Sequence, residues 1–384
     1  MPRGRVQAVA AIVIGAGPAG LATSQQLGAR GVRHVVLERG DAVGHTWANL
    51  YDSLTLHTGK HLSSLPGLRF PRAYPLFVPR PLFCDYLRRY AETFRLPVET
   101  GSAVTAVRRD DGVWRVSTAR GDHTARAVVI ATGIVANPQR PRFRGAESFR
   151  GRLTHSVEYR NPAPYVGRRV LVVGVGNSGA EIGSEIARAG GGGVVTIAVR
   201  SGANVVPRTM FGLPIQYLAY WVRKLPRPAQ EAIVAGVRKL TELRRGPSVL
   251  PRPRHSPLEA IPVIGFHLVD AIRAGLIRVK PGLAEFTPEG ARFADDSVEP
   301  FDDVILATGF APALGPLGTA VRTDAKGFAL RTARVASVDQ PNLYFVGHNY
   351  DATGGLYNIR IDSRLVARHN RPAHGRGPIV ARNL

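Results

Sequence analysis

Short apolar runs separated by glycine-rich turns and helical stretches recur along this chain of 384 residues. Residues 9–14 are almost entirely apolar, which is typical of a parallel strand buried on both faces. A glycine-rich turn follows, then a helical stretch over 21–30 and a second apolar run over 35–37. The same order returns between residues 169 and 199. This alternation predicts an α/β fold with two Rossmann-like dinucleotide-binding domains.

The first turn has the spacing G-x-G-x-x-G at Gly15, Gly17 and Gly20, with Pro18 and Ala19 before the last glycine. The first glycine permits a tight turn, and the second lets the backbone approach a pyrophosphate. The third lets the helix pack closely on the strand. The N-terminus of the helix adds oriented N–H groups. The turn therefore predicts a dinucleotide site.

An acidic residue, Glu38, ends the second apolar run and is followed by Arg39. A carboxylate at this point accepts hydrogen bonds from the ribose hydroxyls of an adenosine, and it repels a 2′-phosphate. The first site is therefore expected to bind FAD or NAD in preference to NADP.

The second turn repeats the spacing at Gly174, Gly176 and Gly179, with Asn177 and Ser178 between the last two glycines. It again lies between an apolar strand and a helical stretch, so it predicts a second dinucleotide site.

Here the following strand ends in Arg200-Ser201 instead of an acid. An arginine and a hydroxyl can hold a 2′-phosphate by charge-assisted hydrogen bonds, although a surface arginine with no such role is the alternative. The contrast between Glu38 and Arg200 assigns FAD to the first site and NADPH to the second.

Two further apolar strands end in the same tripeptide, Ala-Thr-Gly, and small residues there let the backbone pass near a cofactor. A proline-rich linker over 137–141 follows the first, and a loop over 310–318 follows the second. We expect an FAD domain made of residues 1–145 and 306–384, with an NADPH domain inserted over 146–305. The tripeptide residues expected beside a cofactor are Ala131, Thr132, Gly133, Ala307, Thr308 and Gly309.

Near the C-terminus an apolar strand over 343–346 leads through Gly347 to a glycine pair that ends at Gly355. A helix is expected from Leu356 to about residue 366. Its N-terminus would face the pyrimidine edge of a flavin and stabilise the reduced anion. The basic tail over 367–384 is expected to be mobile.

Charge and cysteine content narrow the function classes. The formal net charge is +23, but only five of the 51 basic residues are lysines and the arginines are scattered. No motif places them in a nucleic-acid groove, so we expect no nucleic-acid partner. An arginine-biased composition explains the charge, and attraction of anionic substrates or phospholipid is the alternative.

The single cysteine, Cys84, excludes a redox-active pair and fits a reducing compartment. No apolar run reaches the roughly 18 residues of a membrane span, so a cytoplasmic protein is expected. No metal site is predicted, and nothing indicates the oligomeric state.

Between the two turns, Phe149, Gly151, His155 and Tyr159 follow the pattern F-x-G-x-x-x-H-x-x-x-[FY]. With this segment the chain resembles the flavin-containing monooxygenases over nearly its whole length, most of all the YUCCA-type plant enzymes and bacterial relatives. The segments 51–57 and 199–208 support the resemblance. So does the stretch from Gly44 to Trp47, which is similar to a flavin-contacting segment of the family. A tryptophan in place of Tyr159 would instead mark Baeyer–Villiger enzymes.

The resemblance implies an enzyme that holds FAD and NADPH and inserts one oxygen atom from O2 into a small organic substrate through a C4a-(hydro)peroxyflavin. It suggests an aromatic 2-oxo acid such as indole-3-pyruvate, with a soft nitrogen or sulfur nucleophile as the alternative. Two other functions stay open. One is an NADPH oxidase or flavin reductase without productive oxygenation, and the other is a non-catalytic nucleotide-sensing flavoprotein. Disulfide reductases share the two-nucleotide plan but need a second cysteine.

The resemblance also singles out two histidines and one segment. His57 begins the stretch His-Thr-Gly-Lys where many family members have Asn-Thr-Ser-Lys. We expect a catalytic role for it at the flavin edge or in the substrate pocket, with packing as the alternative. His155 is expected to orient the two domains. Residues 210–223 are expected to roof the active site, to form a packed insertion or to touch a membrane surface.

Overall fold

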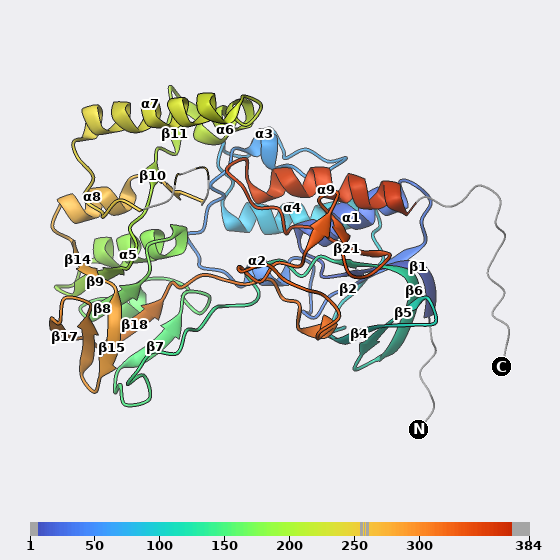
Figure 1. Cartoon of the computed structure of the whole chain (residues 1–384), viewed down its shortest axis with the longest axis horizontal. Coiled ribbons are helices and arrows are strands. Elements are labelled where there is room, and N and C mark those ends of the chain that lie inside the picture. Colours follow the sequence, from blue (N-terminus) through green and yellow to red (C-terminus); the bar gives the residue numbers. More distant parts are fainter. Residues whose placement is uncertain (1–6, 254–255, 257, 259–260, 371–384) are drawn as a thin grey trace.

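The computed structural model describes residues 7–253, 256, 258 and 261–370, and it places two sheets side by side (Figure 1). The nine-stranded sheet has the order β19-β20-β21-β6-β1-β2-β3, with β5 paired to β6 and β4 to β5. Neighbours from β21 to β3 along this order are parallel. Its strands are β1 (Gln7–Ile14), β2 (His34–Leu37), β3 (Val98–Glu99), β4 (Val104–Asp110), β5 (Val113–Thr118), β6 (Gly121–Ile130), β19 (Arg331–Thr332), β20 (Ala336–Ser337) and β21 (Leu343–Phe345).

Helices cover one face of this sheet. Val13 and Val129 of the sheet belong to one buried cluster with Leu21, Phe83 and Val366 of the helices. The opposite face packs around Trp114. The helical elements of this half are α1 (Pro18–Gly28), α2 (His45–Ala48), α3 (Lys60–Ser63), α4 (Arg80–Thr93), η2 (Gly315–Leu317) and α9 (Gly355–His369).

The five-stranded sheet is parallel throughout, in the order β14-β9-β8-β18-β7. Helices α5 and α8 pack on one face around Ile182 and Leu268, and a three-stranded antiparallel sheet covers the other around Phe293. The elements are β7 (Arg152–His155), η1 (Ala163–Tyr165), β8 (Arg169–Val173), α5 (Asn177–Ala189), β9 (Val194–Val199), α8 (His267–Arg273), β14 (Ile277–Pro281), β15 (Leu283–Thr287), β16 (Gly290–Phe293), β17 (Val298–Pro300) and β18 (Asp303–Leu306).

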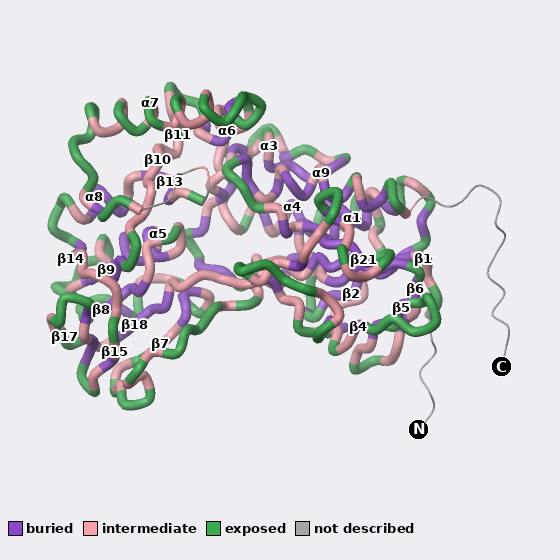
Figure 2. Tube along the Cα trace, in the orientation of Figure 1, coloured by how far each residue is buried: buried purple, intermediate pink, exposed green. Residues whose placement is uncertain are grey.

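A third group of elements is the α6–α7 layer, whose helices α6 and α7 lie at the top of the molecule in Figure 1. None of the residues of α7 is buried, and the layer is largely exposed or half-buried in Figure 2. Among the described residues, no helix has both the length and the apolar character needed to cross a membrane. The layer consists of β10 (Val205–Val206), β11 (Thr209–Met210), β12 (Leu213–Pro214), α6 (Ile215–Val222), α7 (Arg227–Arg245) and β13 (Val263–Ile264).

The predicted α/β class with two Rossmann-like sheets is confirmed. Some boundaries differ. The two helices that follow the G-x-G-x-x-G turns begin inside those turns, at Pro18 and Asn177, because each turn supplies the first helical residues. Helix α9 continues to His369, so residues 367–369 are helical and do not belong to the tail; residues 371–384 lie outside the described part of the chain.

Candidate functional site

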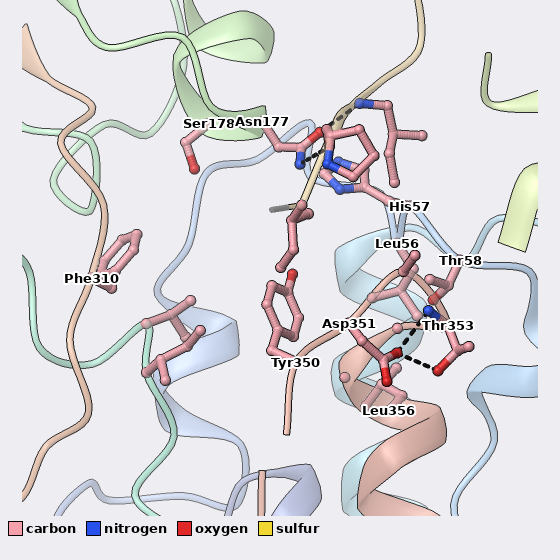
Figure 3. A pocket seen from close by; sticks show the side chains of 18 of the residues that line it. Leu56, His57, Thr58, Asn177, Ser178, Phe310, Tyr350, Asp351, Thr353 and Leu356 are labelled. Carbon is pink, nitrogen blue, oxygen red and sulfur yellow. Dashed lines mark hydrogen bonds between the residues drawn. The ribbon is translucent and has the colours of Figure 1, made fainter. Parts of the chain in front are cut away.

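A cavity of about 1240 Å³ lies between the two sheets and extends beneath the α6–α7 layer. Figure 3 shows Asn177 and Ser178 on one side of it and Leu356 on another, with the Tyr350 ring between them. Among the described residues, no group of three His, Cys, Asp or Glu side chains could hold a metal ion. The predicted site residues that line the cavity are Gly15, Gly17, Pro18, Ala19, Glu38, Arg39, Gly44, Trp47, His57, Ala131, Thr132, Gly133, Asn177, Ser178, Gly347, Gly355 and Leu356.

The glycines of the first turn have three different environments. Gly15 has φ +104°, and a Cβ atom there would lie 2.6 Å from the Ala131 carbonyl oxygen. A Cβ on Gly20 would overlap the Gly15 carbonyl oxygen. A Cβ on Gly17 would meet nothing within 4 Å, although this residue lines the cavity. The backbone of Gly17 is therefore open to a ligand, as a pyrophosphate site requires.

The second turn repeats this geometry. Gly174 has φ +106°, and its Cβ would lie 2.6 Å from the Ala307 carbonyl oxygen. A Cβ on Gly179 would overlap the Gly174 carbonyl oxygen, whereas one on Gly176 would meet nothing within 4 Å. Both turns can therefore admit a phosphate group, but none of these three glycines lines the cavity that contains Gly17.

In each half, the strand that follows the glycine turn and its helix ends in a charged residue, and these two residues differ in burial. Glu38 is buried, and its carboxylate accepts hydrogen bonds from the backbone N–H groups of Ala16 (2.7 Å) and Gly40 (2.9 Å). Arg200 and Ser201 are exposed, and among the described residues no carboxylate pairs with Arg200. A fixed buried carboxylate at one site and a free guanidinium at the other have the contrast in charge that the sequence predicts.

Asn177 has a structural contact that the sequence did not reveal. Its Nδ2 donates to the Pro262 carbonyl (3.1 Å) and its Oδ1 accepts from the Ile264 N–H (2.8 Å), as the dashed lines in Figure 3 show. The side chain therefore holds β13 against the first turn of α5. Ser178 makes no such bridge and faces the cavity.

Each Ala-Thr-Gly segment is bonded to the linker that follows the other one, and the two linkers also pair with each other. The Thr132 hydroxyl donates to the Ala313 carbonyl (3.1 Å), and the Thr308 hydroxyl donates to the Gln139 carbonyl (2.6 Å). Residues 137–139 and 309–311 lie antiparallel, joined by backbone hydrogen bonds. Thr308 is thus part of the junction between the two halves of the molecule, and it does not line the cavity.

The N-terminus of α9 faces the cavity and is held by a polar network in which Thr353 and Asn358 are buried and Asp351 is exposed. Gly354 precedes the helix with φ +95°. Asn358 Nδ2 donates to Asp351 Oδ1 (3.0 Å), which also accepts from the Thr353 N–H (2.8 Å). From α6, Gln216 donates to the Thr353 carbonyl and accepts from the N–H of residue 59 (2.9 Å). The loop before α9 is therefore fixed both to its own helix and to the α6–α7 layer.

His57 lines the cavity and is bonded to the opposite half of the molecule. Its Nε2 lies 2.7 Å from Oε1 of Glu181 on α5, and the Tyr51 hydroxyl donates to the other oxygen of the same carboxylate. Burial alone would raise the pKa of Glu181, but the hydrogen bonds from His57 and Tyr51 and the nearby His57 charge hold it below its usual value. Glu181 therefore stays ionised and joins the 51–57 loop to α5.

One turn further along α5, Glu185 makes a second link. Its Oε2 accepts from the hydroxyls of Ser53 (2.9 Å) and Tyr159 (3.0 Å). Sequence reasoning singled out neither glutamate. Their four-residue spacing on the fingerprint helix was the available signal, because it puts both on one helix face.

His155 is fully buried beneath the junction of the linkers. Its Nδ1 accepts from the Val157 N–H (3.1 Å), so Nε2 carries the hydrogen and donates to the Gly309 carbonyl (3.1 Å). The ring also packs edge-on against Phe310, and burial lowers its pKa. These contacts fit a neutral histidine that orients the two halves.

Comparisons with known proteins agree with this geometry. A model of the family described as flavin-binding monooxygenase-like matches residues 8–347. The chain is 37% identical over 311 residues to an indole-3-pyruvate monooxygenase of Oryza sativa subsp. japonica, covering 78% of this chain and 76% of the relative. It is 34% identical over 309 residues to a probable indole-3-pyruvate monooxygenase of Arabidopsis thaliana, covering 78% and 75%.

Among solved structures, a flavin-containing monooxygenase from Stenotrophomonas maltophilia superposes with a TM-score of 0.75 at 25% identity, covering 95% of this chain and 98% of that one. The predicted resemblance and the predicted cofactors are thereby confirmed. The chain belongs to the flavin-binding monooxygenase-like family and is a flavin-containing monooxygenase that uses FAD and NADPH.

Proposed function

We propose that this enzyme oxidises an aromatic 2-oxo acid, with one oxygen atom of O2 entering the product carboxylate. The overall reaction is R-CH2-CO-COOH + O2 + NADPH + H⁺ → R-CH2-COOH + CO2 + H2O + NADP⁺. The observation that carries the substrate class is the 37% identity to an indole-3-pyruvate monooxygenase over 78% of the chain. Beyond the first glycine turn, the cavity wall includes the apolar side chains of Ile215, Leu218 and Val222, which suit a flat apolar substrate.

The residues of the cavity fit FAD. The open backbone of Gly17 suits the pyrophosphate, Glu38 suits the adenosine ribose, and the N-terminus of α9 at Gly355 suits the electron-rich end of the flavin. Gly176 and Arg200 are assigned to NADPH in the same way. Bound FAD supplies the oxygen-activating chemistry, and NADPH supplies the reducing hydride. With this placement, residues 1–145 and 306–384 are proposed to form the FAD-binding domain, and residues 146–305 the NADPH-binding domain.

The protein's own task in this proposal is to hold the substrate and to exclude water. Helix α6 contributes Ile215, Leu218 and Val222 to the cavity wall while Gln216 fixes it to the loop before α9. Of the three alternatives for residues 210–223, the proposal is therefore the roof over the active site. His57 is proposed to contact the substrate or the flavin edge from the cavity wall. A cytoplasmic location is part of the same proposal.

A product search tests the substrate class. The FAD-loaded enzyme is incubated with NADPH, O2 and a panel of aromatic 2-oxo acids, amines and sulfides, and products are identified by mass spectrometry. The expected result is a shortened carboxylic acid from a 2-oxo acid. Oxidised amines or sulfides without any shortened acid would refute the 2-oxo acid and favour a soft nucleophile.

A further inference from the structure

We propose that Glu181 positions His57 so that its ring offers a charged N–H to an anionic group of the substrate, and that this pair selects substrates that carry a carboxylate. The inference rests on the proposed function, because it assigns a recognition role within the same cavity. Glu181 acts through His57 and is a positioning residue, whereas His57 would touch the substrate.

The geometry orients the imidazole ring. His57 Nε2 is 2.7 Å from Glu181 Oε1, and the Tyr51 hydroxyl binds the other carboxylate oxygen. Both oxygens are therefore engaged, which fixes the plane of the carboxylate and with it the direction of the ring. The two partners come from different halves of the molecule, since Glu181 lies on α5 and His57 on the loop that leads to α3.

The other ring nitrogen is available to a ligand. Within the described part of the chain, Nδ1 of His57 has no protein partner and is not among the buried polar atoms, and His57 lines the cavity. An imidazolium ring carries an N–H on both nitrogens, and one of them would donate to Glu181 Oε1 at 2.7 Å. The second N–H then offers a charged donor at the cavity wall, and a carboxylate is its natural acceptor.

The segment that carries His57 contacts the loop before α9. The next residue, Thr58, packs against Gly354, where a Cβ would come within 2.7 Å of the Thr58 methyl group. Gly354 immediately precedes α9, whose N-terminus faces the cavity. An anionic group bound by His57 would therefore hold the substrate close to the α9 N-terminus.

Other charged and titratable groups face the same carboxylate. Tyr51 is bonded to it, and burial with the adjacent carboxylate charges raises the tyrosine pKa, so its hydroxyl stays neutral. His267 of α8 also interacts with it, but burial lowers the pKa of this histidine. Arg208 is a further cation near Glu181, and its guanidinium donates to the Leu56 carbonyl at 3.1 Å. Tyr51 and His57 both bind Glu181 and line the cavity, but the Tyr51 hydroxyl is neutral and donates to Glu181, whereas His57 has a second ring nitrogen without a protein partner in the described part of the chain.

Ligand binding tests the proposal without turnover. Phenylacetate and its uncharged analogue phenylacetamide are titrated by calorimetry into the FAD-loaded enzyme at one fixed pH. The wild type is expected to bind the acid about tenfold more tightly than the amide, the size of one charge-assisted hydrogen bond. Glu181→Gln keeps an oxygen for Nε2 but removes the charge, so the preference should fall close to parity.

Glu185→Gln is the matched control, because this residue also joins α5 to the 51–57 loop but contacts only hydroxyl groups. It should retain the acid preference. If Glu181→Gln retains too little flavin to titrate, His57→Gln should show the same loss of preference. If Glu181→Gln and Glu185→Gln lost the acid preference equally, Glu181 would be only a structural link and the proposal would be overturned. Equal binding of acid and amide by the wild type would also overturn it. A retained preference without oxidation of any 2-oxo acid would contradict only the proposed reaction.

Discussion

Replacing Gly17 with alanine separates the cofactor role of the first glycine turn from its structural role. Gly17 has φ −79°, which alanine adopts readily, and an added Cβ would meet no protein atom within 4 Å. The free energy of unfolding of the FAD-free protein should therefore change by less than about 1 kcal/mol. The added carbon nevertheless enters open space at the cavity wall, where the pyrophosphate of FAD is expected.

The effect on FAD binding follows from the hydrogen bonds that a displaced pyrophosphate loses. Backbone N–H bonds to a charged phosphate are worth about 1.5 kcal/mol or more each, so the loss of two raises the Kd for FAD about 100-fold. Titration of the FAD-free protein with FAD, followed by flavin fluorescence, measures this Kd. Thermal unfolding without FAD measures the structural cost.

The equivalent change at the second turn is the matched variant. Gly176 has φ −73° and the same open surroundings, so Gly176→Ala should weaken NADPH and leave the Kd for FAD within about twofold. An unchanged Kd for FAD in Gly17→Ala would refute the placement of FAD. If both variants lost the same nucleotide, the assignment of one nucleotide to each turn would be wrong.

Three further substitutions test other parts of the account. Arg200→Ala should weaken NADPH at least tenfold and barely change NADH, because only NADPH carries the 2′-phosphate; equal losses in Kd for both would exclude the phosphate contact. Gly20→Ala should prevent stable folding, because its Cβ would overlap the Gly15 carbonyl oxygen; a melting temperature equal to that of the wild type would contradict the close helix–strand packing. Hydrogen bonds from the Arg169 side chain and N–H lower the pKa of Asp302 from 3.8 to about 2, so the stability this group contributes is present above about pH 4 and lost as the pH falls toward 2. Acid unfolding of Asp302→Asn should therefore be less steep over that range, and parallel curves would show that the exposed ion pair contributes little.

The sequence predicted what depends on local geometry. The two turns, the strands beside them and the acid–arginine contrast all lie within about forty residues of each fingerprint, so spacing alone encodes them. The family pattern that ends at Tyr159 predicted the flavoenzyme class before any contact was known. His57 was singled out as a catalytic residue; it lines the cavity, and its catalytic role stays a prediction.

Contacts between distant segments could not be read in this way. Glu181 meets His57 across 124 positions, and Gln216 meets the N–H of residue 59 across 157. No local pattern marks such partners, because helix periodicity indicates which residues share a face and not what that face touches. Asn177 lies in the second glycine turn and was expected beside the cofactor. Its side chain is bonded to β13, a contact that the local pattern did not indicate. Helix α7 was also not predicted, because its apolar positions do not enter a buried core.

The central claim is productive transfer of oxygen by a flavin enzyme that uses NADPH. Its most direct test is turnover of the FAD-loaded enzyme under ¹⁸O2 with an aromatic 2-oxo acid, in which NADPH consumption, hydrogen peroxide and labelled product are measured together. The expected result is one ¹⁸O atom in the carboxylate of each product molecule, with product formed in proportion to NADPH. Hydrogen peroxide formed one-for-one with NADPH and no label in any product would contradict it and identify an NADPH oxidase.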